Sequence, residues 1–404
     1  MTNYILNNFK NGKAFIYQEK CINGEVVIGN RICIDTKGNK LFELPEVGMI
    51  VNEFEDEDIA FVMNYDSQYA LLDNKGKFLT EFIYNNISRN SDEGLFYATK
   101  NGKHGYIDIR GNEIIPFIYE CCNAFSEGLT AVKLDEKWGM VDFLNNTVIP
   151  FDYDDITICY NNIITAQKDG KWGLINKQNE ILVDFQFDLI DNWASKKSYT
   201  YPAMLNNKYG LIDRQGNILE EFIYDYIDVI SDTDDIIGEY LRFEKDNKCA
   251  LYSTRRKTFL TEFIYDDIEF CYENKLCVTL DNKIGFIDIN GEVIAPIVYD
   301  SSSTFYNEGF VAVQKNGLHG ALDSTGKEVI PCEYRFLGNF NEGIACATNQ
   351  ERQEGYIDKN DNTVIPFGKY RSCSDFHCGL AKVFDKELGQ VYINKQDEVL
   401  KIKV

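Results

Sequence analysis

Short stretches of alternating hydrophobic and polar residues recur along this chain, each closed by turn-forming residues. In one copy, residues 129–133 alternate, residues 137–142 surround the dipeptide Trp138-Gly139, and residues 148–153 form a third apolar stretch that ends in Tyr153. Alternation with a period of two is typical of a strand with one buried face. Two tight turns join the three stretches, so each copy predicts a three-stranded antiparallel meander.

The turns have recognisable residues. Between the first two stretches stands Asn-Gly or Asp-Gly, as at Asn101-Gly102 and Asp169-Gly170, and these residues tolerate the positive φ of a tight hairpin. Between the second and third stretches stands Asp-x-x-Gly, as in residues 288–291, where the Asp side chain accepts a backbone hydrogen bond two residues on. No stretch keeps a helical period, so we expect no long helix.

The same phrase, an apolar residue followed by Ile-Asp or its equivalent, ends the second stretch of every copy. It ends at eleven positions: Asp35, Asp73, Asp108, Asp142, Asn176, Asp213, Ser253, Asp288, Asp323, Asp358 and Asn394. A fixed period of about 35 residues indicates a solenoid, a propeller or another repeat array. We therefore predict one continuous β-repeat domain over residues 1–404, with an N-terminal cap at 1–29 and a C-terminal cap at 380–404.

The linkers between copies carry apolar residues at two fixed positions, which we expect to pack one meander against the next. The first position holds Ile87, Cys122, Ile156, Ile190, Ile227, Ile268 and Leu337, and the second holds Phe125, Cys159, Trp193, Ile230, Cys271, Phe305, Phe340 and Phe376. An open superhelical, solenoid-like stack accepts any number of units, whereas a closed propeller typically has 4–8 blades of four strands. Eleven three-stranded units favour the open form, with a closed propeller-like ring as the alternative.

The phrase Gly170-Lys-Trp-Gly-Leu-Ile-Asn176 resembles the WG-repeat (KWG-repeat) proteins, a bacterial family named for its Trp-Gly dipeptide. Residues 102–108 and 137–142 carry similar phrases, and the resemblance covers essentially the whole chain. It implies an all-β repeat with a role in binding or scaffolding, and it brings no catalytic residues. Departures from the dipeptide are His104, Tyr209, Cys249, Ile284, His319 and Glu354 at the Trp position, and Ala70, Ala250 and Val391 at the Gly position.

Charge and composition limit the partners. The chain carries 41 Lys and Arg against 64 Asp and Glu, a net charge of −23, so we expect no nucleic acid on a broad basic face. No secretory signal and no apolar run of about 18 residues is present, so we expect no membrane contact and a cytoplasmic location. Its 12 Cys should then be free thiols, and the protein a monomer by itself.

Few residues suggest chemistry. His104 and His319 occupy the Trp position, which takes a large planar side chain, so we interpret them as packing residues. Cys373, His377 and Cys378 form a run able to bind zinc, but Cys373 stands in an apolar linker position and no fourth ligand follows. One Asp per turn is too few for Ca²⁺, which takes six to eight oxygens. We therefore expect no catalytic, cofactor or metal site.

Two linkers, 192–199 and 231–238, are irregular, and insertions in repeat proteins often lie on the binding side. The residues expected to contact a protein partner there are Lys196, Lys197, Asp232, Asp234 and Asp235. The predicted function is a non-catalytic protein-interaction scaffold. Two alternatives remain: an acidic decoy or immunity factor that binds a basic toxin or nuclease, and a hydrolase with a carboxylate pair in the concave face.

Overall fold

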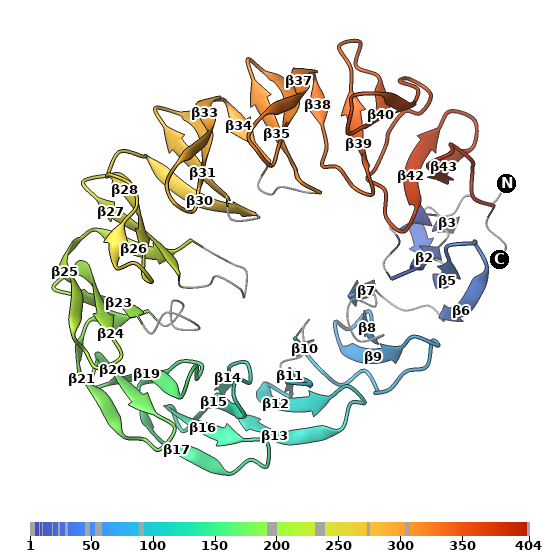
Figure 1. The fold of residues 1–404 in the computed structure, drawn as a ribbon. Helices are drawn as coiled ribbons and strands as arrows, with labels where there is room; N and C mark the ends of the chain where they lie inside the picture. Colours follow the sequence, from blue (N-terminus) through green and yellow to red (C-terminus); the bar gives the residue numbers. More distant parts are fainter. Residues whose placement is uncertain are drawn as a thin grey trace.

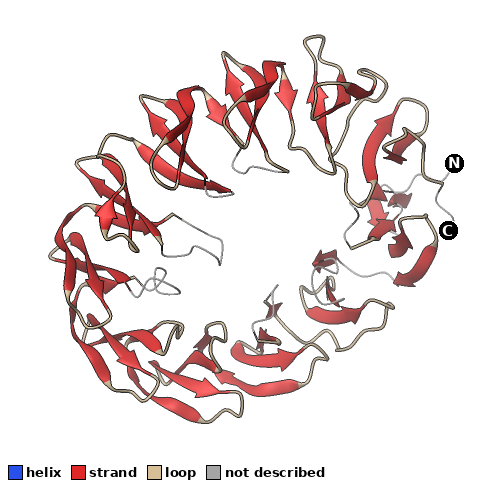
Figure 2. Cartoon of the chain, viewed as in Figure 1, coloured by secondary structure: helices blue, strands red, loops and turns tan. Residues whose placement is uncertain are grey.

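The computed structural model describes residues 5–7, 9, 11–17, 19–22, 25–28, 31–44, 49–52, 59–88, 93–191, 200–230, 239–272, 275–303 and 308–401. In this part of the chain the regular elements are β-strands, grouped in small antiparallel sheets that stand around a ring (Figures 1 and 2). None of the described residues forms a helix with the length and apolar character to cross a membrane. The prediction of an all-β repeat is confirmed.

Nine of the described sheets have four strands each. The first four are β1 (Ile5–Leu6), β2 (Lys13–Tyr17), β5 (Arg31–Asp35) and β6 (Lys40–Leu44); β10 (Asn86–Ile87), β11 (Leu95–Lys100), β12 (Lys103–Asp108) and β13 (Glu113–Tyr119); β14 (Cys121–Cys122), β15 (Leu129–Leu134), β16 (Lys137–Asp142) and β17 (Thr147–Tyr153); and β18 (Asp155–Ile156), β19 (Ile163–Lys168), β20 (Lys171–Asn176) and β21 (Ile181–Phe187).

The next five are β22 (Leu189–Ile190), β23 (Thr200–Leu205), β24 (Lys208–Asp213) and β25 (Ile218–Tyr224); β26 (Tyr226–Val229), β27 (Tyr240–Lys245), β28 (Lys248–Ser253) and β29 (Thr258–Phe259); β30 (Asp267–Tyr272), β31 (Lys275–Leu280), β32 (Lys283–Asp288) and β33 (Val293–Tyr299); β34 (Ser301–Ser302), β35 (Phe310–Lys315), β36 (Leu318–Asp323) and β37 (Glu328–Tyr334); and β38 (Phe336–Leu337), β39 (Ile344–Thr348), β40 (Glu354–Asp358) and β41 (Thr363–Ile365).

Two smaller sheets stand in the same circle, and one hairpin is separate from both. The first contains β7 (Met49–Asn52), β8 (Ile59–Met63) and β9 (Tyr69–Asp73), the second contains β42 (Leu380–Asp385) and β43 (Gly389–Asn394), and the hairpin consists of β3 (Glu19–Ile22) and β4 (Glu25–Ile28). Counted by its four-stranded blades, the protein is a nine-bladed β-propeller (Figure 1).

A blade contains one strand more than the meander that the sequence predicts. The blade β14–β17 has the three expected strands, and β14 pairs through Cys121 and Cys122 with Lys133 and Val132 of β15. This extra strand comes from the linker, and it lies toward the centre of the ring, while β17 lies at the rim (Figure 1). The prediction of three strands was wrong because a pair of two residues is too short to produce a visible alternation.

The predicted hairpin turns are confirmed. Asn101 and Gly102 have φ of 53° and 74°, and Asp169 and Gly170 have φ of 52° and 74°. Both residues of each turn are therefore left-handed, as a two-residue hairpin of matching twist requires.

The Gly of the Trp-Gly dipeptide is required by a close approach of the outermost strand. A Cβ built on Gly139 would lie 2.7 Å from the carbonyl oxygen of Ile149, because β17 bulges toward β16 between Trp138 and Met140. The four chain copies that lack this Gly hold Ile32, Ala70, Ala250 and Val391. Among the described residues of those copies, no seven-residue outer strand crosses the position, so a side chain fits.

The core lies between blades, as the linker positions predict. One cluster joins Met140, Ile149 and Tyr153 of one blade to Ile156 and Cys159 of the next, and all five are less than 5% exposed. The first linker position is buried at Ile87, Ile156, Ile190, Ile227, Ile268 and Leu337, and the second at Phe125, Cys159, Ile230, Phe340 and Phe376. The Cys122 side chain is half-buried. Trp193 and Phe305 lie outside the described residues, and of Cys271 only the backbone is described.

The ring is closed, so the expectation of an open superhelix was wrong. The ring of Phe9 packs against that of Tyr392 with centroids 5.0 Å apart, and the Tyr392 hydroxyl donates to the carbonyl of Asn7. Ala14, Ile16, Ile34 and Leu380 complete this cluster. Segments 1–29 and 380–404, interpreted as caps, thus meet each other (Figure 1). The repeat defines one blade, but the rotation from blade to blade, which decides closure, accumulates over the whole chain.

Because neighbouring strands are antiparallel, the connections alternate between two faces of the ring. The turn face carries the connections from the first to the second strand and from the third to the fourth strand of each blade. The hairpin face carries the connections between the second and third strands, together with the links to the next blade.

Candidate functional site

Both carboxylate oxygens of the recurring Asp on the turn face accept hydrogen bonds from residues of its own turn. Asp142 Oδ1 accepts from the backbone N–H groups of Leu144, at 2.9 Å, and Asn146, at 2.8 Å, while Oδ2 accepts from the Asn146 side chain at 2.9 Å. Asp108, Asp213 and Asp358 make the same set of bonds. The interpretation of this Asp as a turn former is confirmed.

On the hairpin face, the Lys before Trp and the Asp after Tyr tie successive blades together. Lys137 Nζ lies 2.7 Å from Asp154 Oδ1, and Asp154 Oδ2 accepts from the backbone N–H of Gly170 in the next hairpin at 3.1 Å. Equivalent pairs are Lys171–Asp188, Lys208–Asp225, Lys248–Asp266 and Lys283–Asp300. The Lys before Trp and the Asp after Tyr of each repeat thus stabilise the contact between neighbouring blades.

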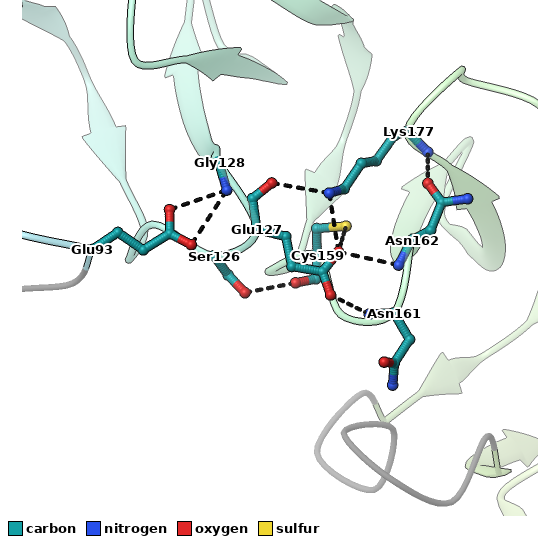
Figure 3. Close-up of polar contacts among 8 residues, drawn as sticks. All are labelled: Glu93, Ser126, Glu127, Gly128, Cys159, Asn161, Asn162 and Lys177. Carbon is teal, nitrogen blue, oxygen red and sulfur yellow. Dashed lines mark hydrogen bonds and ion pairs between the residues drawn. The ribbon is translucent and has the colours of Figure 1, made fainter.

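On the turn face, the Glu of a recurring Glu-Gly pair also connects successive blades (Figure 3). Glu127 accepts from the backbone N–H groups of Asn161, at 2.5 Å, and Asn162, at 3.2 Å, in the next blade. Lys177 Nζ lies 3.0 Å from the Glu127 carboxylate and donates to its carbonyl at 2.9 Å. Glu93, Glu308 and Glu342 accept from Gly128, Gly343 and Gly379 in turn. We missed this clasp, although Glu-Gly recurs at the repeat period.

The carboxylates of Glu127, Glu308 and Glu342 are held in the charged form. Although burial alone raises the pKa of Glu127, the hydrogen bonds from Lys177, Asn161 and Asn162 hold it below its ordinary value. The pKa of Glu308 and of Glu342 is lowered for corresponding reasons. A general acid of a glycoside hydrolase needs a raised pKa, so these repeated Glu residues are unsuited to that role.

The histidines and the suggested zinc run are not brought together. His104 and His319 are half-buried on β12 and β36, in separate blades, and burial lowers the pKa of both. His377 and Cys378 are exposed, whereas Cys373 is half-buried. The Cys373 thiol instead lies close to the Cys346 thiol and the Glu354 carboxylate. The two sulfur atoms and a carboxylate oxygen are all within 4.8 Å of one another.

The five residues expected to contact a partner, Lys196, Lys197, Asp232, Asp234 and Asp235, lie outside the described residues. Their linkers are the connections from β22 to β23 and from β26 to β27, so both leave and re-enter neighbouring blades on the turn face. Thr200 follows the first linker and Glu239 follows the second.

A cavity of about 430 Å³ lies where these two linkers end. Thr200, Arg214 and Lys257 contribute to its walls, together with Asp213 and Thr254. The backbone N–H of Thr254 donates to the Glu239 carbonyl at 3.0 Å, which connects the cavity wall to the end of the second linker. The cavity therefore spans the boundary between blades β22–β25 and β26–β29, at the base of both insertions.

Basic residues gather at and next to this cavity in an otherwise acidic protein, and two of them, Arg214 and Lys257, line it. The turn after β28 reads Ser253-Thr-Arg-Arg-Lys257 where most copies have an Asp-initiated turn, and Arg255, Arg256 and Lys257 are exposed. The Arg256 guanidinium donates to Asn290 Oδ1 in the following blade at 2.7 Å. Arg214, in the preceding blade, is also exposed. Four basic side chains thus cover two blade boundaries of the turn face.

Lys257 also lowers the pKa of Asp213 in the neighbouring blade. Burial alone raises the pKa of Asp213, but hydrogen bonds from Asn217 and Gln215 and the nearby Lys257 hold it below its ordinary value. Asp213 is therefore charged, and it compensates only part of the positive charge around the cavity.

Comparison of the sequence with models of known protein families identifies the family of this chain. The model described as "WG containing repeat" matches residues 69–103, 105–138, 138–172, 172–209, 209–249, 284–318, 320–350 and 355–386, more than half of the chain. No curated protein matches it by sequence.

Similar solved structures have low sequence identity. The computationally designed Ika8 protein is 12% identical with a TM-score of 0.36, over 70% of this chain and 96% of that one. A eukaryotic initiation factor is 9% identical with a TM-score of 0.43, over 74% and 93%. BamB from Moraxella catarrhalis is 9% identical with a TM-score of 0.31, over 76% and 95%.

Proposed function

This chain belongs to the WG-repeat family, and we propose that it is a non-catalytic scaffold that binds a protein partner on its turn face. The observation that supports the proposal is the basic cavity between blades β22–β25 and β26–β29. Repeat proteins commonly bind through irregular units of an otherwise regular array. Here the one turn with three consecutive basic residues, Arg255 to Lys257, follows Thr254, which is bonded to Glu239, and Lys257 shares the cavity wall with Thr200.

The charge of this region indicates the chemistry of the partner. With a net charge of −23, the chain as a whole repels acidic proteins. Arg214, Arg255 and Lys257 reverse the sign locally, and Arg side chains bind carboxylates through paired hydrogen bonds. We therefore propose that an acidic segment of the partner places carboxylates at this cavity, near Thr200 and Glu239, the described residues at which the two irregular linkers end.

The proposed setting is the cytoplasm, with the protein as a monomer before it binds. The ten cysteines whose side chains are described are free thiols, which fits a reducing compartment.

The test is affinity capture from cells that naturally make the protein, with three baits. The baits are the wild-type chain, the charge-reversed variant Arg255→Glu/Lys257→Glu, and a matched control, Arg110→Glu. Arg110 is exposed in the corresponding turn of blade β10–β13, so it tests for a general charge effect. Reversing two charges close to a partner carboxylate costs about 1 kcal/mol or more each.

A stoichiometric partner should therefore be recovered with the wild type and the Arg110→Glu chain, and be depleted roughly tenfold or more with the double variant. Equal recovery with all three baits would refute binding at this cavity. A basic partner that is kept by the double variant and released by salt would instead support the acidic-decoy alternative.

A further inference from the structure

The Trp position of blade β38–β41 holds a carboxylate in place of a ring. Glu354 begins β40, Cys346 lies in β39, and Cys373 lies in the linker that pairs with Val383 of β42. The two sulfur atoms and a Glu354 carboxylate oxygen all lie within 4.8 Å of one another. Cys346 is only 4% exposed, and the other two residues are half-buried. We propose that Cys346, Glu354 and Cys373 form a binding site for a thiophilic divalent cation, with Zn²⁺ as the expected ion.

The placement of the carboxylate supports a cation. Glu354 Oε2 accepts from the backbone N–H of Cys373 at 2.7 Å. Within the described part of the chain, no Lys or Arg forms an ion pair with it, in contrast to Glu127, Glu308 and Glu342, which each pair with a Lys. A half-buried carboxylate with one neutral donor is poorly compensated, and a divalent cation would supply the missing charge.

The distances suit a small tetrahedral ion after a modest movement. Zn²⁺ takes Cys sulfur at about 2.3 Å and carboxylate oxygen at about 2.0–2.2 Å, which puts ligand atoms about 3.5–3.8 Å apart. Side-chain rotations that move the two sulfur atoms and the carboxylate oxygen about 1 Å closer together would give that separation. Three protein ligands leave a fourth position for water. Binding releases the two thiol protons to solvent and forms two metal–thiolate bonds and one metal–carboxylate bond.

The backbone around the three ligands is already fixed. The Tyr356 hydroxyl donates to the carbonyl of Ser374, next to Cys373, at 2.7 Å, and its ring packs edge-on against Phe376 with centroids 5.1 Å apart. The backbone N–H of Gly368 donates to the carbonyl of Glu354 at 2.9 Å. Both sides of the site are therefore held before an ion arrives, which lowers the cost of ordering the ligands.

The site would tie the blade β38–β41 to the last sheet, β42–β43. That sheet contacts the N-terminal blade through Tyr392 and Phe9. The ion would therefore bind at the sheet that closes the ring. This inference does not depend on the proposed partner site, which lies in other blades.

The alternative use of two neighbouring thiols is a disulfide between Cys346 and Cys373. A disulfide would need an oxidant, and it would leave the Glu354 carboxylate half-buried and uncompensated. The presence of the carboxylate in the same cluster therefore favours the cation, and the disulfide becomes an outcome of the test.

The experiment uses the reduced, metal-free full-length chain titrated with Co²⁺ and then Zn²⁺. Thiolate-to-Co²⁺ charge transfer in the near ultraviolet reports sulfur ligation directly, and displacement by Zn²⁺ gives its affinity. Wild-type protein should bind one equivalent and show the band. Cys346→Ser and Cys373→Ser should lose it, and Glu354→Gln should keep the fold and bind at least tenfold more weakly.

A matched control is Cys159→Ser, because the Cys159 thiol lies 3.6 Å from the Glu127 carboxylate, and among the described residues no second thiol joins these two groups. This variant should bind one equivalent like the wild type. Absence of the charge-transfer band in the folded wild type would overturn the proposal. So would a loss of 2 Da under mild oxidation, showing a disulfide, in protein that binds no Co²⁺ when reduced.

Discussion

Replacing Gly139 with Ala tests why the Trp-Gly dipeptide requires glycine. By backbone propensity alone, Ala in a strand is better than Gly by about 0.5–1 kcal/mol. In this fold, however, the new Cβ would lie 2.7 Å from the Ile149 carbonyl oxygen and 3.1 Å from the Phe151 ring, whereas ordinary contacts begin at 3.4 Å. Propensity and tertiary structure therefore predict effects of opposite sign.

The size of the effect follows from how firmly the outer strand is held. Widening the gap by about 0.7 Å moves β17, which pairs with β16 at Trp138 and Tyr153 and again at Met140 and Ile149, on both sides of the contact. Overpacking of this kind costs about 1–3 kcal/mol. Subtraction of the propensity gain leaves about 0–2.5 kcal/mol. Because β17 is paired on both sides of the contact and cannot easily yield, we expect Gly139→Ala to lower the free energy of unfolding by about 1–2 kcal/mol within that range.

The assay is equilibrium unfolding in urea, followed by tryptophan fluorescence, for which Trp138 is an adjacent reporter. With a slope near 3 kcal/mol per M, the midpoint should fall by about 0.3–0.7 M. Ala250→Gly is the matched control, because the same position there faces no long outer strand. It should be destabilised by about 0.5–1 kcal/mol through propensity. A Gly139→Ala variant as stable as the wild type, or more stable, would refute the steric explanation.

Two further predictions concern contacts between blades. Because its folded-state pKa is lowered, Glu127 contributes stability that is present above the unfolded pKa, about 4.3, and is lost as pH falls through the folded pKa. Thermal unfolding from pH 7 to 3 should therefore show a smaller acid-induced loss for Glu127→Gln than for the wild type, and parallel curves would contradict this. Tyr392→Ala removes a ring that is 2% exposed and should cost about 3–5 kcal/mol. It should also enlarge the radius of gyration in X-ray scattering by loosening the contact with Phe9, whereas unchanged dimensions would argue against closure through this contact.

The candidate sites differ in how visible they are along the chain. The insertions at 192–199 and 231–238 interrupt a regular pattern, so they stand out, and the described ends of both, Thr200 and Glu239, lie at the basic cavity. The cavity itself needs walls from two blades, and no linear pattern predicts it. The Cys346, Glu354 and Cys373 cluster was missed because residues from two neighbouring sheets converge there, whereas the run of Cys373, His377 and Cys378 separates into one half-buried and two exposed positions.

What the sequence by itself determined is the set of turns and the strand alternation within one blade. Hairpin turns, Asp turns and strand alternation depend on residues a few positions apart, so Asn101-Gly102 and the Asp142 turn were predictable from local residues. The tertiary structure alone decided the fourth strand, the Glu127 clasp and the closed ring. The fourth strand is a two-residue pairing, too short to carry a pattern of its own. The clasp and the closed ring join residues that are one period or nearly the whole chain apart, such as Asn7 and Tyr392. Their formation depends on the small rotation between successive blades, which no single repeat encodes and which only the sum over the ring makes decisive.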